Sequence, residues 1–239
     1  MHSAFWGELI GTAVLILLGN GVVACVILQD SYGRNSGWIV ITAGWCFAVM
    51  AGVVTALALG SQAHLNPAVT LAAAVASGDW RLLPVYVPAQ LIGAMLGASL
   101  VWLHYLTLWG RTPDASAKRA CFCTAPAVRN LPANVLSEVI GTFVLVLVAA
   151  ALSSRGVSST GLAPGVGPIA VGMLVWGIGL SLGGVTGYAI NPARDLGPRI
   201  MHAVLPIAGK GGSDWGYAPV PIAGPIVGAA LAGFVARAL

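Results

Sequence analysis

The sequence predicts an all-α membrane protein with six transmembrane helices, two re-entrant half-helices and an inverted repeat. Three observations carry this prediction. The composition is 58% hydrophobic and only 8% charged. Apolar segments of spanning length follow one another along the chain, and each half of the chain holds one copy of a short Asn-Pro-Ala segment. Together they predict that residues 1–239 form one transmembrane domain.

The composition is too apolar for a protein that is surrounded by water. A soluble domain carries about 25% charged residues, against 8% in these 239 residues. The lipid bilayer suits such a chain, and six spans of about 20 residues fit its length. The net charge of +4 includes no basic run, so nucleic acid is not an expected partner.

Six apolar segments are long enough to cross a bilayer as helices, which satisfy their own backbone hydrogen bonds in lipid. They cover about 4–28, 38–59, 84–108, 134–152, 166–184 and 218–238. Two further apolar stretches, about 67–77 and 192–204, are too short to span. Both lie between full spans and start at an Asn-Pro-Ala tripeptide, which is the pattern of a re-entrant half-helix.

The two halves of the chain repeat each other. Residues 7–12 (GELIGT) correspond to 137–142 (SEVIGT), and a second Asn-Pro-Ala answers the first. We expect repeats over about 1–108 and 133–239, joined by a linker over about 109–132. Three spans per repeat give the copies opposite orientations, and interrupted segments at matching positions point to a site near the bilayer midplane.

The two Asn-Pro-Ala segments have the residues of a capped helix start, with proline in the first turn and asparagine as N-cap. They comprise Asn66, Pro67, Ala68, Asn191, Pro192 and Ala193. If the half-helices enter from opposite faces, their positive N-terminal dipoles meet near the membrane centre. Asparagine amides could then donate to a passing oxygen. Such a passage suits neutral hydroxylic solutes and repels protons and cations.

Both segments also resemble a known family. Residues 64–70 (HLNPAVT) and 187–195 (GYAINPARD) look like the two signature loops of the aquaporin superfamily, the major intrinsic proteins. The likeness covers nearly the whole chain, because the spans and the repeat match too. It implies a channel whose outer constriction, the selectivity filter, is built from four residues.

Three filter positions follow directly from this resemblance: Gly179, Tyr188 and Arg194. For the fourth, an ungapped count back from the first asparagine gives Cys46. However, residues 44–49 (GWCFAV) resemble a glycerol-channel segment whose tryptophan is the filter residue, which favours Trp45. The alternative interpretation of Trp45 is an aromatic residue at the membrane–water interface. For Arg194 a functional role is expected by default, because an arginine at membrane depth is costly.

The resemblance assigns further roles around the two loops. Two intramembrane acids, matched across the repeat, brace the loop backbones, with a proton relay as the rival role. Loop support is expected from Glu8, Glu138, His64 and Asp195. Backbone carbonyls facing the pore are expected at Gln62, Ala63, His64, Gly187, Tyr188 and Ala189.

The filter residues make an amphipathic slot, and Asp195 and Pro221-Ile222 resemble the glycerol branch. The resemblance therefore implies passive diffusion of glycerol and other small uncharged solutes, with some water, and exclusion of ions and protons. The alternative is a water-selective channel with poor solute conduction, although such channels typically place a histidine opposite the arginine. Gln62 in place of glycine and Tyr188 in place of phenylalanine leave the preferred solute open.

Other classes fit less well. An ion-coupled transporter needs acids along the substrate path, and both acids are better explained as braces. No nucleophile–base pair favours an enzyme, and no cofactor or metal ion is expected. Cys121 and Cys123 form a C-x-C pair without a matching cluster and are expected to be unpaired small residues.

The family likeness also implies a homotetramer in the plasma membrane with both termini in the cytoplasm. The spacing Gly93-x-x-x-Gly97 permits close helix packing, either between subunits or within one. With Arg194 and Arg199 set aside, this orientation places six basic residues outside and three inside. That is the reverse of the positive-inside rule. The filter arginine must lie on its matched side, so we retain the family orientation.

Overall fold

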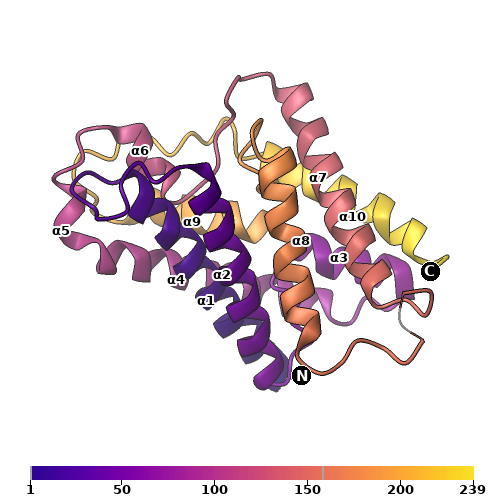
Figure 1. Ribbon diagram of the computed structural model, residues 1–239. Coiled ribbons are helices and arrows are strands. Elements are labelled where there is room, and N and C mark those ends of the chain that lie inside the picture. Colours follow the sequence, from indigo (N-terminus) through magenta and orange to yellow (C-terminus); the bar gives the residue numbers. More distant parts are fainter. Residues whose placement is uncertain (1, 158) are drawn as a thin grey trace.

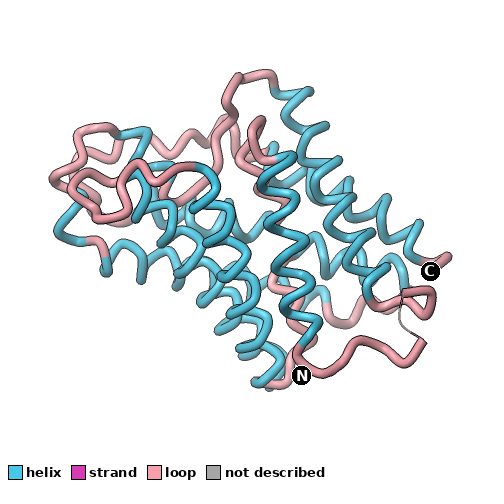
Figure 2. Tube along the Cα trace, in the orientation of Figure 1, coloured by secondary structure: helices cyan, strands magenta, loops and turns pink. Residues whose placement is uncertain are grey.

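The computed structural model describes residues 2–157 and 159–239, and within these ranges the secondary structure is helical, with no strand (Figure 2). The elements are α1 (His2–Ile27), α2 (Trp38–Ala58), α3 (Pro67–Ser77), α4 (Leu83–His104), α5 (Leu106–Trp109), α6 (Ala115–Ala120), α7 (Leu131–Leu152), α8 (Val166–Leu182), α9 (Pro192–Val204) and α10 (Val220–Ala236). The all-α prediction is confirmed.

The six predicted spans correspond to α1, α2, α4, α7, α8 and α10. Among the described helices, four are long and apolar enough to cross a membrane, namely α1 from Ser3 onward, α2, α4 and α7. The apolar helices α8 and α10 have 17 residues each. At a rise of 1.5 Å per residue they are about 26 Å long, near the lower limit for a span.

The half-helices α3 and α9 begin at the prolines of the two Asn-Pro-Ala segments. Each packs mainly on a span from the other half of the chain, α3 on α10 and α9 on α4. Glycines allow the close approach: a Cβ at Gly233 would lie 2.8 Å from the carbonyl oxygen of Ala72, and a Cβ at Gly197 would lie 2.7 Å from Ala94 Cβ. The two halves are therefore interlocked through their short helices.

The spans of each half pack through glycines as well. A Cβ at Gly93 of α4 would lie 2.2 Å from the Leu9 carbonyl of α1, and one at Gly228 of α10 would lie 2.4 Å from the Val139 carbonyl of α7. Gly97 approaches the Ala13 carbonyl in the same way. The Gly93-x-x-x-Gly97 spacing thus serves contacts within one subunit, the second of the two alternatives above.

The segment predicted as a linker contains α6 and follows the short helix α5, and these two helices lie at the left of Figure 1. The third predicted span ends at His104 rather than at 108, because the chain breaks at Tyr105 and restarts as α5. In Figure 1 the N-terminal end lies at the lower centre and the C-terminal end at the right, and both are away from α5 and α6.

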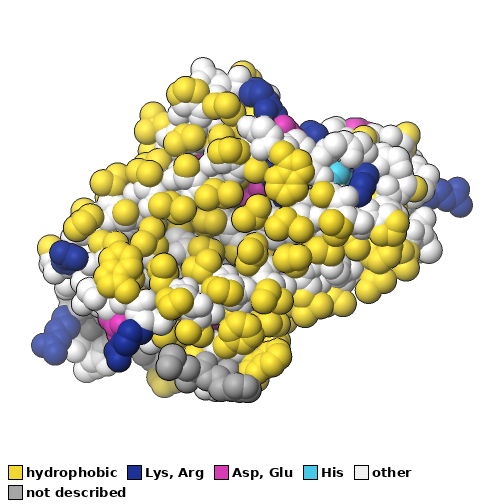
Figure 3. Space-filling view, turned by 180° about the vertical axis from the view of Figure 1, so that it is seen from behind, with side chains coloured by type: hydrophobic (Ala, Val, Ile, Leu, Met, Phe, Trp, Pro, Cys, Tyr) yellow, Lys and Arg dark blue, Asp and Glu magenta, His cyan; other side chains and the backbone are white. Residues whose placement is uncertain are grey.

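Large apolar side chains are exposed along the spans. Hydrophobic side chains cover the middle of one face of the molecule, and Lys and Arg side chains lie toward its ends (Figure 3). Exposed examples on α4, α7 and α10 are Leu96, Leu103, Leu136, Ile140, Leu231 and Phe234. A contiguous apolar surface of this kind suits lipid rather than water.

Candidate functional site: the pore

A cavity of about 610 Å³ runs between the two halves. Its lining is mostly apolar and comes mainly from α1, α2, α3, α7, α8 and the two loops that precede α3 and α9, with one residue each from α9 and α10. Both asparagines of the paired segments line it, together with Trp45, Tyr188 and Arg194. Residues far apart in the sequence, predicted to act together, therefore meet around one passage.

The first loop is held by Glu8, whose side chain is fully buried. Its Oε1 accepts from Ser61 Oγ at 2.6 Å and from the His64 amide at 2.9 Å. Its Oε2 accepts from the Leu65 amide at 2.7 Å and from Gln90 Nε2 at 2.8 Å. The carboxylate thus supplies the acceptors that this non-helical backbone lacks inside a membrane protein.

The second loop repeats the same arrangement around Glu138. Its Oε1 accepts from Thr186 Oγ1 at 2.6 Å and from the Ala189 amide at 2.9 Å, and its Oε2 accepts from the Ile190 amide at 2.7 Å. Both acids bond to loop backbone, as the brace interpretation expects.

Alternate residues of both loops adopt left-handed backbone conformations. The φ angles are 56° at Ala63 and 53° at Leu65, and 39° at Tyr188 and 43° at Ile190. Such angles are costly for residues with a Cβ and persist only when surrounding bonds enforce them. The amides donate to the buried acids, which leaves the loop carbonyls free for other partners. Of the six residues predicted to present carbonyls, five line the cavity: Gln62, Ala63, His64, Tyr188 and Ala189; Gly187 is not among the described lining residues.

The two asparagines connect the loops at the centre of the cavity. Asn66 Nδ2 donates to the Ile190 carbonyl at 2.8 Å, and Asn191 Nδ2 donates to the Leu65 carbonyl at 2.9 Å. Their Oδ1 atoms cap the half-helices by accepting backbone N–H groups, that of Ala68 for Asn66 and those of Ala193 and Arg194 for Asn191. The N-termini of α3 and α9 are therefore held against each other, and their dipoles sum there.

His64 lies on the first loop and supports it. Its Nδ1 is 3.2 Å from Thr70 Oγ1, and its ring meets the Tyr86 ring edge-on with the centroids 5.1 Å apart. The Tyr86 hydroxyl accepts from the Gln62 amide at 3.1 Å. These contacts attach the first loop to α3 through Thr70 and to α4 through Tyr86.

Three predicted filter residues meet at one place. The Arg194 guanidinium carbon lies 4.4 Å from the centroid of the Trp45 ring, a cation–π geometry. Arg194 Nη1 also donates to the Phe122 carbonyl at 3.3 Å. Tyr188 lines the same cavity. The passage here combines two aromatic rings with one fixed positive charge.

Gly179 contributes space rather than a side chain. A Cβ at this position would lie 2.8 Å from Tyr188 Cζ and 2.9 Å from its hydroxyl oxygen. The Gly179 carbonyl accepts from Trp38 Nε1 at 3.0 Å, and the Trp38 ring meets the Tyr188 ring edge-on at 5.9 Å. A glycine therefore allows the tyrosine ring to sit against α8.

Cys46, the other candidate for the fourth filter position, points elsewhere. Its Sγ lies 4.0 Å from Met173 Sδ of α8. It is buried and is not among the described residues that line the cavity, whereas Trp45 is. The geometry favours Trp45.

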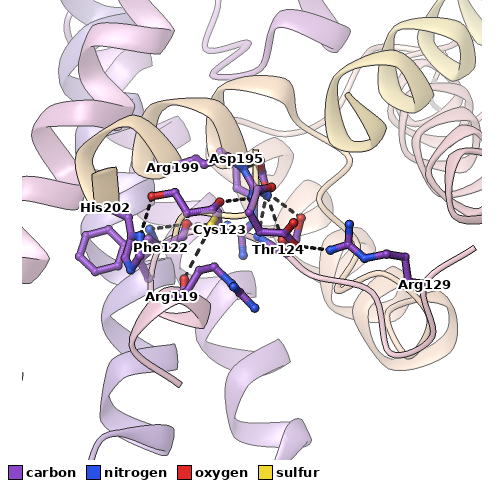
Figure 4. Close-up of polar contacts among 12 residues, drawn as sticks. Arg119, Phe122, Cys123, Thr124, Arg129, Asp195, Arg199 and His202 are labelled. Atoms are coloured by element: carbon purple, nitrogen blue, oxygen red, sulfur yellow. Dashed lines mark hydrogen bonds and ion pairs between the residues drawn. The ribbon is translucent and has the colours of Figure 1, made fainter. Parts of the chain in front are cut away.

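Asp195 belongs to a buried polar cluster outside the filter (Figure 4). Its Oδ1 and Oδ2 accept from Arg199 Nε at 2.7 Å and Nη2 at 2.9 Å. Oδ2 also accepts from the amide and hydroxyl of Thr124, both at 2.7 Å. Arg199 donates further to the carbonyls of Thr124, Ser213 and Asp214. This cluster ties α9 to the linker and to the segment before α10.

The C-x-C pair also lies in this region. Cys121 Sγ is 3.3 Å from the Ala117 carbonyl and Cys123 Sγ is 3.8 Å from the Arg119 carbonyl. Burial raises the pKa of the Cys123 thiol to about 12, with a further rise from nearby Asp195. Both cysteines are free, and within the described ranges no group of three or more His, Cys, Asp or Glu could hold a metal ion.

Several residues that hold the site were not among the predicted site residues. Gln90, which bonds to Glu8 and Thr70, was visible as a lone amide within an apolar span. Arg199 was visible as a partner four residues after Asp195 on α9. Thr124 and Phe122 had no signal, because they act through a linker whose path the sequence does not reveal.

Residues 1–236 match the family described as major intrinsic protein. The chain belongs to this family. It is therefore a multi-pass integral membrane protein, and the resemblance to the aquaporin superfamily is confirmed.

Two curated relatives are similar over almost all of the chain. A Thermotoga maritima protein named "Probable glycerol uptake facilitator protein" is 53% identical over 230 residues, covering 96% of each chain. A Bacillus subtilis protein named "Glycerol uptake facilitator protein" is 53% identical over 234 residues, covering 97% of this chain and 82% of the relative.

A solved structure shares the fold. The X-ray structure of the aquaglyceroporin from Plasmodium falciparum superimposes with a TM-score of 0.84 at 29% identity, covering 98% of this chain and 94% of that one. The likeness confirms the architecture of six spans and two re-entrant half-helices.

Proposed function

We propose that this protein is a passive channel for glycerol and other small uncharged solutes, with some water, that excludes ions and protons. The observation that carries the proposal is the pair of asparagine-capped half-helices held together by the 2.8 Å and 2.9 Å cross-bonds. Two helix N-termini facing one passage repel cations. The remaining amide hydrogens and loop carbonyls suit the hydroxyl groups of a neutral solute.

The filter supports a polyol over water alone. Trp45 and Tyr188 offer aromatic surface to a carbon chain, while Arg194 and loop carbonyls offer bonds to its hydroxyls. His64 is the one histidine among the described lining residues, and it lies on the first loop rather than beside Arg194. The relatives named as glycerol uptake facilitators agree with this solute class.

The roles of the individual residues follow from their contacts. Asn66 and Asn191 bind the passing solute at the centre, and Trp45, Gly179, Tyr188 and Arg194 form the filter. Glu8 and Glu138 brace the loops, helped by His64 and Asp195. We expect no proton relay through the acids, because each already accepts several hydrogen bonds from its own loop.

We further propose that four such subunits, each with its own pore, assemble in the plasma membrane with both termini in the cytoplasm. The position of both chain ends on one side of the molecule (Figure 1) suits an even number of spans. The proposed repeats, about 1–108 and 133–239, suit the matching braces at Glu8 and Glu138. Cross-linking and native mass spectrometry in mild detergent test the assembly, and an active monomer contradicts it.

Stopped-flow light scattering of proteoliposomes tests the function. We expect rapid glycerol entry that no sodium or proton gradient can drive uphill. Accumulation against a solute gradient contradicts a passive channel, and rapid water flux without glycerol flux favours the water-selective alternative.

Two substitutions test the filter. Trp45→Ala widens it, so bulkier polyols should enter and size discrimination should weaken, while the matched Cys46→Ala changes little. Arg194→Val removes one of the two positive barriers, so a proton leak should begin. A barrier on the order of 1–3 kcal/mol corresponds to a change in ion flux of about 5- to 150-fold. Unchanged solute and proton fluxes in both variants would place the constriction elsewhere.

A further inference from the structure

Gly19 of α1 lies directly behind the filter tryptophan. A Cβ at this buried glycine would lie 2.3 Å from Cζ3, 2.4 Å from Cε3 and 2.5 Å from Cη2 of Trp45. Non-bonded carbon atoms favour separations of about 3.5–4.0 Å. Any side chain at position 19 therefore requires the indole ring to move by about 1 Å or more.

The indole ring has little freedom on its other sides. The Arg194 guanidinium lies over it, and the ring is only 5% exposed. The cavity that it lines is the open space beside it. A ring displaced from Gly19 therefore moves toward the passage and toward the filter arginine.

Asn20, the next residue of α1, shares a hydrogen-bond acceptor with the filter arginine, Arg194. Its side chain is fully buried, and its Nδ2 donates to the Phe122 carbonyl at 3.2 Å. The same carbonyl accepts from Arg194 Nη1 at 3.3 Å. One amide on α1 thus fixes the acceptor that orients the filter arginine.

We propose that Gly19 and Asn20 are positioning residues for the filter, which set its width and the direction of its charge from behind. The proposal rests on the proposed function in that the filter must discriminate among solutes. Neither residue touches the passage: Gly19 acts through Trp45, and Asn20 acts through Phe122 and Arg194.

The test of Gly19 compares Gly19→Ala with Gly21→Ala. A Cβ at Gly21, on the same helix, meets no atom within 4 Å, so this control carries the same change in helix propensity without the clash. We expect Gly19→Ala to lower the glycerol-to-water permeability ratio by about tenfold, the discrimination that one methylene gives in a pocket. Gly21→Ala should leave the ratio unchanged.

A second substitution separates positioning from simple loss of structure. In Gly19→Ala/Trp45→Phe the smaller ring makes room for the new methyl group, so the permeability ratio should return toward that of Trp45→Phe alone. If Gly19→Ala lowers water and glycerol permeability by one common factor, or if the smaller ring does not restore the ratio, the inference is wrong.

Asn20→Leu tests whether Asn20 positions Arg194 through the Phe122 carbonyl. If Asn20 acts through Arg194, the substitution should raise the proton leak in the natural chain and have no further effect in an Arg194→Val background. Equal effects in the two backgrounds contradict this role.

A measurement that needs no transport keeps the inference separate from the proposed function. In protein labelled with 5-fluorotryptophan, the ¹⁹F resonance that disappears in Trp45→Phe belongs to Trp45. It should shift in Gly19→Ala and stay in place in Gly21→Ala. A channel that conducts no glycerol but shows this shift refutes the proposed solute alone. An unchanged Trp45 resonance refutes the positioning role, whatever the channel conducts.

Discussion

The loops before α3 and before α9 are held by the same pattern of hydrogen bonds. Each is braced by a buried glutamate that accepts the amides at equivalent positions, His64 and Leu65 in one and Ala189 and Ile190 in the other. Each ends in an asparagine that caps its own half-helix and donates to the opposite loop. The centre of the pore is therefore close to symmetric.

The half-helices that follow differ sharply. Within the described residues α3 carries no charged side chain, and a neutral amide, Gln90, completes its brace. In α9, Arg194, Asp195, Arg199 and His202 are all buried. Three of them are charged, and they bond to the linker and to the segment before α10 (Figure 4).

The shared and unshared features of the two halves have different structural roles. The features that the halves share bring two helix N-termini and two asparagine amides together at the centre of the cavity. The features found only in the second half hold Arg194 in a fixed position, where it faces Trp45 from the first half in the proposed filter. Substitutions in the outer cluster around Asp195 should therefore affect the second half alone. Substitutions in the two matched loops should differ only where the hydrogen bonds of the matched side chains differ.

The largest effect is expected from Arg199→Met. This fully buried arginine pairs with Asp195 at 2.7 Å and 2.9 Å and bonds to three carbonyls. Its removal leaves a buried carboxylate without its cation, which costs about 3–5 kcal/mol of unfolding free energy. Denaturant titration in mixed micelles measures the loss.

Arg81→Met is the matched control for this prediction. Arg81 pairs with Asp79 at 2.6 Å, but the arginine side chain is 87% exposed. The ion pair holds the pKa of the Asp79 carboxyl near 2, yet solvent screens it and its removal should change stability little. Equal losses in the two variants would contradict a buried structural role for Arg199.

A smaller effect is expected when the braces are altered. Glu8→Gln and Glu138→Gln each replace one acceptor oxygen with a donor, which leaves a loop amide unsatisfied at a cost of about 1–3 kcal/mol. The two variants should then differ in whether a second substitution can restore their stability. Gln90→Glu should restore part of the stability of Glu8→Gln, because the donor and acceptor of the pair at 2.8 Å simply exchange.

The second loop offers no such exchange of donor and acceptor, because no described side chain pairs with Glu138 as Gln90 pairs with Glu8. In the described structure Glu138 accepts from its own loop alone, through Thr186, Ala189 and Ile190. A rescue of Glu138→Gln by a substitution on α10, measured by the same titration, would show that the two braces are alike after all.

The smallest difference is expected between the two caps. Asn66 Oδ1 accepts one backbone N–H, whereas Asn191 Oδ1 accepts two. Both alanine variants lose a cross-bond and a cap, worth about 0.5–2 kcal/mol. Asn191→Ala should lose about 0.5–1.5 kcal/mol more, the net contribution of one additional hydrogen bond. Identical unfolding free energies for the two variants would contradict the asymmetry.

Much of this arrangement could be predicted from local patterns. The start of each half-helix lies at the predicted proline, because the Asn-Pro pair fixes a cap and a first turn without distant help. The predicted span over 84–108 was too long, because apolar residues continue through the break at Tyr105. Hydropathy measures solubility in lipid and does not record where a helix ends.

The fourth filter position shows the limit of a count along the chain. Trp45 and Cys46 are adjacent, and an ungapped alignment favours the cysteine. One residue is about 100° around a helix, so the two side chains face different neighbours: Trp45 faces Arg194 and the cavity, and Cys46 faces Met173.

The sequence by itself determined that the protein lies in a lipid bilayer, that its two halves repeat, and where the two half-helices begin. Composition, hydropathy and caps act within a few residues or a single helix, so each can be found in one segment. Only the tertiary structure decided what stands behind the filter: Gly19 against Trp45, the Phe122 carbonyl beside Arg194, and Arg199 between the linker and α9. These contacts join residues up to about 75 positions apart. The first depends on how α1 packs on α2, and the other two depend on how the linker folds back onto α9, which no local pattern encodes.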